Sequence, residues 1–207
     1  MNIHVYFKKK QHKTSYKYIM VIICGYKKRA GKDQFFQFLK ELLPEKKIYR
    51  VAFADALKEE IDEMVLKPFG LPIDVLEDDD TKPIMRTLLQ WWGTEFRRST
   101  NPKLKGDPDH WINLAHKKIE DFYEQNPDCV IVICDGRFPN EYIATKQKFS
   151  NTVSLLIERN NSNQDAHSSE NIMSEHLHLY DYKIDNNGSL NDFKQKVQNF
   201  VNEYFHE

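Results

Sequence analysis

The chain has 207 residues, 40% of them hydrophobic, so it is long enough for one well-buried core and too short for two comfortable ones. Lys and Arg number 30 against 31 Asp and Glu, a formal net charge of -1 that excludes a nucleic-acid binder relying on a dominant basic face. No apolar stretch reaches the roughly 20 residues that span a bilayer, and the N-terminus lacks the apolar region of a signal peptide. We therefore expect one cytoplasmic domain with no nucleic-acid or membrane partner.

Residues 1–17 are polar, basic and aperiodic, which predicts a flexible extension ahead of a single domain at 18–207. The run 18–24 is continuously apolar and stops at Gly25, as in a central parallel strand buried on both faces. The three cysteines, Cys24, Cys129 and Cys134, have no metal-ligand spacing and are expected to be buried thiols in a reducing compartment.

The rest of the chain alternates strand and helix signals, which favours an α/β architecture over an all-α or all-β one. Further strands are expected at 48–53, 129–134, 152–157 and 182–184. Helices are expected at about 35–42, 55–66, 83–98, 109–125 and 190–204. In the fourth of these helices, one stripe is marked by Trp111, Ala115, Lys118 and Phe122. The polar, unpatterned segment 160–175 predicts a mobile lid over a ligand site.

The strongest motif lies between the first strand and the first helix. It reads Gly25-Tyr-Lys-Lys-Arg-Ala-Gly31-Lys32-Asp33. Glycines let successive backbone N–H groups face an anion, while a lysine supplies a point charge to nucleotide phosphates. Five residues separate the glycines, one more than usual, and Asp33 replaces the usual hydroxyl residue. The alternative is a basic helix-capping turn, but so many cations without an anion would repel each other.

A second motif follows the strand expected at 129–134, where Asp135 and Arg137 stand at the carboxyl end of an apolar parallel strand. Ligands gather at that edge of open α/β sheets. There Asp135 can hold a magnesium-bound water, and the guanidinium of Arg137 can fork onto a phosphate. The alternative is structural: the two residues cap the next helix and pair with Glu141.

Several segments together resemble one family, the deoxynucleoside monophosphate kinases of large phages, and the resemblance covers nearly everything from Met20 onward. These segments are Lys28-Arg-Ala-Gly-Lys-Asp33, Ala52-Phe-Ala-Asp-Ala-Leu-Lys58, Leu89-Gln-Trp-Trp-Gly-Thr-Glu95, Asp107-Pro-Asp-His-Trp111, Asp135-Gly-Arg-Phe-Pro-Asn-Glu141, His167-Ser-Ser-Glu170 and Tyr182-Lys-Ile-Asp-Asn-Asn-Gly188.

The resemblance implies a three-layer P-loop kinase fold with a central parallel sheet, a helical acceptor-binding region at about 55–125 and the lid. It implies ATP with Mg²⁺ on the loop and a deoxynucleoside monophosphate under the helical region, with Lys28 reaching the acceptor phosphate. Asp33 after the lysine is usual in this family, whereas Gln34 stands where a threonine is usual. A homodimer is kept as one option for the assembly.

The candidate site residues fall into four sets. The catalytic set is Lys28, Lys32, Asp135 and Arg137. The ATP-binding set is Gly25, Arg29, Ala30, Gly31, Lys32, Asp33, Gln34 and Arg159. The acceptor-binding set is Lys28, Asp55, Lys58, Arg86, Gln90, Thr94, Glu95, Arg98, Trp111 and Arg137. The metal set is Asp33 and Asp135, the latter through water.

Several of these residues have structural alternatives of similar weight. Asp55 and Lys58 could simply begin a helix, and Glu95 and Arg98 could form a solvated ion pair. Trp91, Trp92 and Trp111 are more often core residues than base-stacking platforms. Arg159 could be a plain surface arginine, and His167 is expected to be a polar loop residue rather than a base.

Three functions compete at this point. The first is ATP-dependent phosphorylation of a deoxynucleoside monophosphate to the diphosphate for dNTP synthesis, in which lysine, arginines and magnesium share the charge of the transferring group. The second is a phosphomevalonate-type kinase, which resembles the same Gly-Lys-Asp loop and Asp-x-Arg strand end. The third is a non-catalytic ATP-binding regulator.

Overall fold

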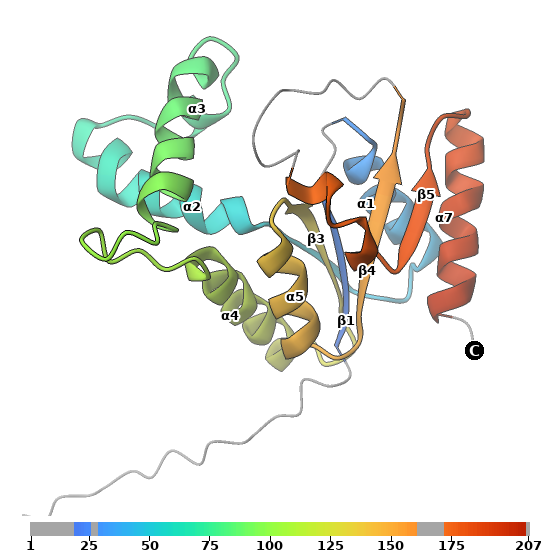
Figure 1. The fold of residues 1–207 in the computed structure, drawn as a ribbon. Coiled ribbons are helices and arrows are strands. Elements are labelled where there is room, and N and C mark those ends of the chain that lie inside the picture. Colours follow the sequence, from blue (N-terminus) through green and yellow to red (C-terminus); the bar gives the residue numbers. More distant parts are fainter. Residues whose placement is uncertain (1–18, 26–28, 161–171, 206–207) are drawn as a thin grey trace, which may run out of the picture.

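The computed structural model describes residues 19–25, 29–160 and 172–205. Its centre is a five-stranded sheet of order β2-β3-β1-β4-β5, in which every neighbouring pair is parallel. The strands are β1 (Met20–Gly25), β2 (Ile48–Val51), β3 (Val130–Gly136), β4 (Thr152–Glu158) and β5 (Tyr182–Asp185). Because all strands run the same way, their carboxyl ends share one edge (Figure 1).

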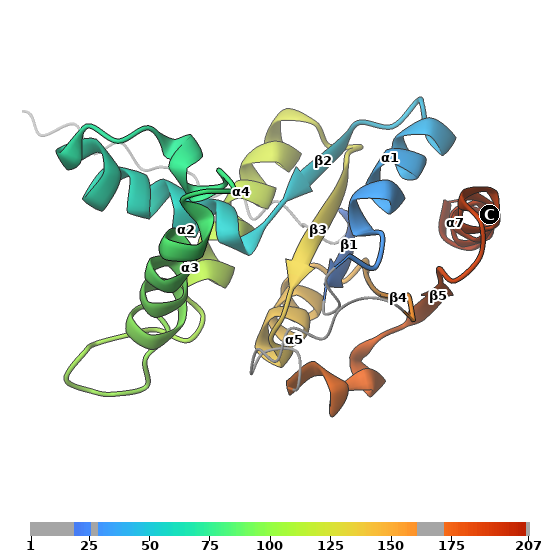
Figure 2. The same cartoon turned by 90° about the horizontal axis from the view of Figure 1, so that it is seen from above.

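Helices cover both faces of this sheet (Figure 2). On one face lie α1 (Lys32–Leu42) and α7 (Leu190–Phe205). On the other lie α4 (His110–Gln125) and α5 (Pro139–Lys148), together with the start of α2 (Phe53–Ile61). This three-layer arrangement confirms the α/β fold with a central parallel sheet. No helix in the described part of the chain is long and apolar enough to cross a membrane.

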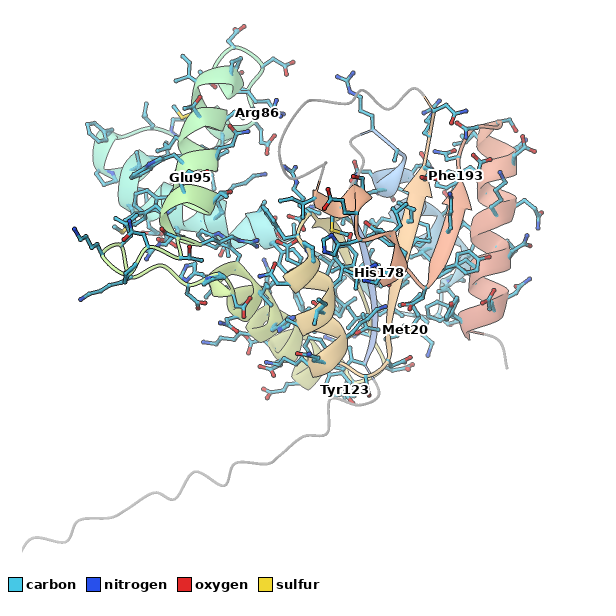
Figure 3. The ribbon with its side chains drawn as sticks, in the orientation of Figure 1. Met20, Arg86, Glu95, Tyr123, His178 and Phe193 are labelled. Carbon is cyan, nitrogen blue, oxygen red and sulfur yellow. The ribbon has the colours of Figure 1, made fainter. Side chains whose placement is uncertain are left out.

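A helical region projects from the sheet beyond α2 (Figures 1 and 3). A π-helical turn (Asp62–Leu66) continues α2, followed by 3₁₀ turns at Lys67–Phe69 and Ile73–Leu76. Then α3 (Lys82–Gln90) runs into a second π-helical turn (Trp91–Phe96). Its small core is formed by Ile61, Leu66 and Leu76, so this region has apolar packing separate from that of the sheet.

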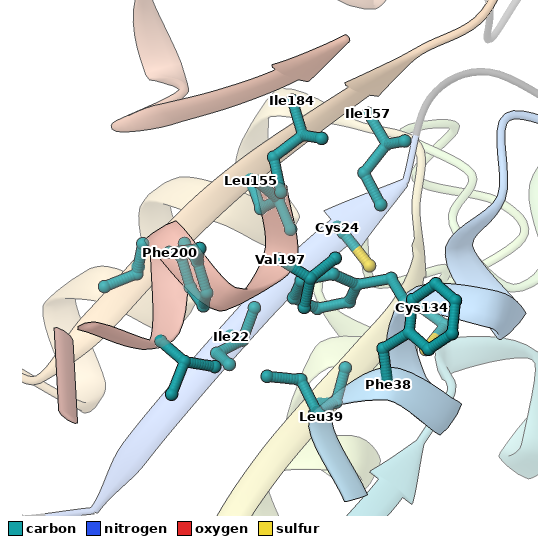
Figure 4. Close-up of a cluster of buried hydrophobic side chains, with 14 of the residues drawn as sticks. Ile22, Cys24, Phe38, Leu39, Cys134, Leu155, Ile157, Ile184, Val197 and Phe200 are labelled. Atoms are coloured by element: carbon teal, nitrogen blue, oxygen red, sulfur yellow. The ribbon is translucent and has the colours of Figure 1, made fainter. Parts of the chain in front are cut away.

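The main core is divided by β1, whose side chains alternate between the two faces and are all buried. Ile22 and Cys24 point into the layer under α1 and α7, with Leu39 and Val197 (Figure 4). On the opposite face, Ile23 joins the layer under α4 and α5. The expected central strand buried on both faces is therefore confirmed, as is the burial of all three free cysteines.

Element boundaries differ from expectation at particular side chains. The strand expected at 48–53 ends at Val51, because Phe53 already belongs to α2. The helix expected at 83–98 changes to π-helical geometry at Trp91. The buried face of α4 includes Ile119 rather than Lys118 of the expected stripe, and the Lys118 ammonium lies 3.8 Å from the Asp55 carboxylate.

A buried histidine joins α4 to α5. The Nε2 of His116 lies 3.0 Å from the Thr145 hydroxyl, which itself donates to the Glu141 carbonyl at 2.6 Å. Since that hydroxyl proton is already used, His116 must donate through Nε2–H. Burial lowers the pKa of His116 to about 4, and Lys148 adds to the lowering.

This pKa predicts a pH-dependent stability. A histidine with a folded pKa below its unfolded value stabilises the fold above the unfolded pKa and loses that contribution as pH falls. Between pH 7 and 5 we expect wild type to lose on the order of 2 kcal/mol more unfolding free energy than His116→Gln, in which an amide replaces the imidazole donor. Urea unfolding at both pH values measures the difference. Equal losses would contradict the assignment.

Candidate active site

A left-handed turn at Arg29 and Gly31 leads into α1 at the carboxyl edge of the sheet. Arg29 and Gly31 have φ values of 59° and 110°, and Gly31 caps the N-terminus of α1. The side-chain amide of Asn186, just after β5, donates to the Ala30 carbonyl at 2.8 Å. A Cβ on Gly31 would lie 2.5 Å from that amide nitrogen. The turn is therefore fixed to the end of a strand that follows it by more than 150 residues.

The strand before this turn makes an unusually close backbone approach. Gly25 pairs with Gly136 of β3, and a Cβ on Gly25 would lie 1.7 Å from the Gly136 carbonyl oxygen. Gly136 is in turn covered by Tyr142, whose hydroxyl donates to the same carbonyl at 3.2 Å. Close packing thus requires the first glycine of the motif.

Lys32 occupies the first position of α1 and is partly buried. Burial lowers its pKa, and the nearby Arg137 guanidinium adds to the lowering, while Asp33 opposes it. Two cations at the carboxyl edge of the sheet thus disfavour each other's charge, which is typical of a site for a multivalent anion. The structure brings together three predicted catalytic residues, Lys32, Asp135 and Arg137.

The Asp135 carboxylate is fixed by α2. Its two oxygens accept the backbone N–H groups of Phe53 and Ala54, both at 2.9 Å. Burial raises its pKa, whereas the two amides and Arg137 lower it. The structural alternative, in which Asp135 caps the helix that follows it, is wrong: it caps α2, and each oxygen keeps a lone pair for a further donor.

Arg137 lies just past the end of β3 with an exposed side chain. Within the described residues its guanidinium has neither a hydrogen bond nor an ion pair. Glu141 binds the backbone N–H of Arg137 at 2.6 Å, not its guanidinium. Arg137 therefore pairs with Glu141 through its backbone alone, and its guanidinium acts electrostatically on Lys32 and Asp135.

The partner of Glu141 is Arg98, from the end of the helical region. Both side chains are buried, and the Arg98 guanidinium carbon lies 4.5 Å from the centre of the Phe138 ring. The solvated pair expected between Arg98 and Glu95 is corrected accordingly. Arg98 is a predicted acceptor contact, but its guanidinium is already engaged by the Glu141 carboxylate and the Phe138 ring.

Two other predicted acceptor contacts also have protein partners. The Asp55 carboxylate accepts the Ala52 N–H at 3.2 Å and so begins α2, as its structural alternative expected. Lys58 forms an ion pair with Glu77, a residue of the segment before α3, and this pairing helps lower the pKa of Glu77. Whether either residue also contacts an acceptor stays a prediction.

The tryptophans separate into two environments. Trp111 is 3% exposed and its indole N–H donates to the Gly93 carbonyl at 2.8 Å, so it is a core residue. Trp92 is half-buried and donates to Glu60 at 3.1 Å. Trp91 is 51% exposed, so its expected core location is wrong. Along the same helical region are the remaining predicted contacts, Arg86, Gln90, Thr94 and Glu95.

A cavity of about 220 Å³ opens beside the N-terminus of α1. It is lined by Gly31, Gln34, Arg159, Asn186, Gly188, Leu190 and Phe193. Three residues of the predicted ATP-binding set therefore border one hollow, and Arg159 lies at its rim as an exposed side chain. Sequence reasoning did not include Asn186 among the candidate site residues, although it lies in the family-like segment Tyr182–Gly188 directly after a strand.

Some predictions fall outside the described residues: the extension at 1–17, Lys28, His167 and positions 161–171 of the lid. The last lid positions are described, and there Met173 is fully buried against the layer under α4 and α5. The described chain thus resumes inside the predicted lid segment with an anchored side chain.

No protein-family model and no curated protein matches this chain. Solved structures with similar folds include a dephospho-CoA kinase from Campylobacter jejuni (TM-score 0.49, 14% identity, 88% of this chain and 96% of that one). A shikimate kinase from Aquifex aeolicus gives a TM-score of 0.44 at 16% identity, covering 89% and 97% of the two chains. A shikimate kinase from Acinetobacter baumannii gives 0.40 at 13%, covering 93% and 98%. Likenesses at this level assign neither activity nor residue roles to this chain.

Proposed function

We propose that this chain is an ATP-dependent kinase that phosphorylates a deoxynucleoside 5'-monophosphate. The observation that carries the proposal is the placement of Lys32, Asp135 and Arg137 at the carboxyl ends of the paired strands β1 and β3, beside the left-handed turn that ends at Gly31. A helix N-terminus with two converging cations suits the β- and γ-phosphates of ATP.

The cavity at α1 supports a place for the rest of ATP. It adjoins Gly31, the residue at which the left-handed turn ends, and it combines the exposed apolar side chain of Leu190 with the guanidinium of Arg159. A flat heteroaromatic ring can pack against an apolar side chain on one side and an arginine on the other. We assign this cavity to the nucleobase of ATP.

The acceptor belongs on the opposite side of Arg137, under the helical region. In the view of Figure 3, Arg86 lies on the side of α3 nearer the sheet. With Trp111 in the core and Arg98 bound to Glu141, we assign first contact with the acceptor phosphate to Arg86 and Arg137 rather than to those two. Binding between two cations would orient the phosphate as nucleophile toward the ATP γ-phosphate.

Magnesium fits the residues present. Within the described residues no cluster of three or more His, Cys, Asp or Glu side chains could hold a metal ion alone, so the ion would arrive bound to ATP phosphates. Asp33 is exposed in the first turn of α1, and Asp135 keeps free lone pairs for a magnesium-bound water. When bound, Mg²⁺ would neutralise charge on the phosphates.

A coupled assay of ADP release tests the proposal against a panel of acceptors. The panel contains the common deoxynucleoside and ribonucleoside monophosphates, phosphomevalonate and a no-acceptor control. We expect turnover with at least one deoxynucleoside monophosphate. Turnover only with phosphomevalonate would favour the rival kinase, and ATP binding without turnover on any acceptor would favour a regulator.

Arg137→Lys should damage activity almost as much as Arg137→Ala, by about a hundredfold in kcat/KM, because lysine keeps the charge and loses the planar fork. Steady-state kinetics with the best acceptor measure both variants. If lysine restores near-normal rates, Arg137 acts only as a charge at a distance and the bidentate role is wrong.

A further inference from the structure

Glu141, in the first turn of α5, joins three parts of the molecule through one carboxylate. Its side chain is only 2% exposed. One oxygen accepts the backbone N–H groups of Arg137 at 2.6 Å and Phe138 at 3.0 Å. The other forms the ion pair with Arg98, which closes the helical region. The strand end that carries Arg137 and the end of the acceptor-side helices thus share a single buried group.

The charge on the buried Glu141 carboxylate depends on these contacts. Burial raises the pKa of Glu141, and the Arg98 guanidinium and the two amides lower it. A carboxylate this deeply buried is tolerated as a charge only while its partners remain in place. Arg98 is held in turn by the Phe138 ring beneath its guanidinium. Displacing any one contact therefore weakens the others.

The direction of the Arg137 side chain depends on this arrangement. Among the described residues its guanidinium has no protein partner, so the backbone at Arg137 is what aims it. That backbone is fixed on one side by the pairing of Gly136 with Gly25 and on the other by the Glu141 carboxylate. The Gly136–Gly25 pairing fixes the end of β3, and the Glu141 carboxylate fixes the direction of the chain that follows it.

We propose that Glu141 is a positioning residue. It fixes the backbone of Arg137 so that the Arg137 guanidinium meets a phosphate beside Lys32, and it holds Arg98 next to the same turn of the chain. This inference rests on the proposed function for the identity of the phosphate. Glu141 itself touches no substrate; it acts through Arg137.

The test is a double-mutant cycle read out by calorimetric binding of inorganic tripolyphosphate to the full chain. Glu141→Gln keeps the side-chain volume and one acceptor oxygen, and loses the charge that holds Arg98. We expect Glu141→Gln to weaken binding about tenfold and Arg137→Ala at least as much. The double variant should bind no more weakly than Arg137→Ala alone, because Glu141 acts through Arg137.

Glu120→Gln is the matched control. Glu120 of α4 pairs with Lys148 of α5 at 2.8 Å, so its loss removes a carboxylate charge from the same pair of helices without touching the Arg137 turn. Binding within twofold of wild type is expected. If Glu141→Gln fails to fold by circular dichroism, Arg98→Lys, which keeps the charge but not the fork, completes the cycle in its place.

If the losses of affinity from the two single variants multiply in the double variant, Glu141 and Arg137 act independently and the proposal is overturned. Unchanged binding by Glu141→Gln, or no binding of tripolyphosphate by wild type, would also overturn it. The readout needs no turnover, so the two proposals fail separately. A chain with the expected coupling and no activity on any acceptor keeps this inference and loses the kinase assignment. Turnover without coupling does the reverse.

Discussion

Lys32→Ala is expected to lower kcat by two to three orders of magnitude while leaving the fold intact. The ammonium stands at the N-terminus of α1 next to Arg137, where negative charge would grow on the transferring phosphoryl group. Removing one preorganised charge of this kind typically costs about 3–4 kcal/mol of transition-state stabilisation. Single-turnover measurement of phosphoryl transfer reports this loss directly.

Stability should change little in the same variant. Burial and Arg137 both oppose the charge on Lys32, as its lowered pKa records, so the charge itself contributes little to folding. Urea unfolding within about 1 kcal/mol of wild type is expected. Lys40→Ala serves as the control, since Lys40 is an exposed lysine in the last turn of the same helix. Turnover by Lys32→Ala within about tenfold of wild type would refute the assignment.

Gly25→Ala should have the largest effect on stability, a loss of at least about 3 kcal/mol. The added methyl carbon would lie 1.7 Å from the Gly136 carbonyl oxygen, and backbone held between β1 and Tyr142 has no room to move. Urea unfolding at constant protein concentration measures the loss.

Gly70→Ala separates this collision from backbone strain. Gly70 has a φ of 67°, but a Cβ there would meet nothing within 4 Å, so only the left-handed conformation is penalised. We expect a loss of about 1–2 kcal/mol. Equal losses at the two positions would mean that the strand pairing tolerates a side chain, and the close approach of β1 to β3 would then be wrong.

The sequence predicted the layers of the fold because its strongest patterns are those of buried strands and amphipathic helices. The continuous apolar run ending at Gly25 and the helical spacing from Leu190 onward both correspond to single observed elements, β1 and α7. The helical region was harder to predict. Its π-helical turns at Asp62–Leu66 and Trp91–Phe96 shift the faces of the helices, so burial no longer follows a 3.6-residue period, and Trp91 becomes exposed.

The candidate site shows the same division. Residues placed by a local motif, Lys32 and Arg137, lie together at the edge where the strand ends predicted them. Partnerships across long separations in sequence could not be read from spacing: Arg98 with Glu141, Asp135 with the first amides of α2, and Asn186 with Ala30. Each of these depends on which strands are neighbours in the sheet, and the order β2-β3-β1-β4-β5 is not written in any local pattern.

The place of β1 in the middle of the sheet also sets the order of events during synthesis. Val130, the partner of Met20 in β3, is added about 110 residues later, and the partners in β4 follow still later. At the usual 5–20 residues per second, the most apolar strand of the nascent chain waits on the order of ten seconds for its first neighbour. The entropic cost of closing a loop over that distance must be met before strand pairing stabilises the chain. The first half of this chain must therefore remain soluble, or be shielded, until the second half has emerged.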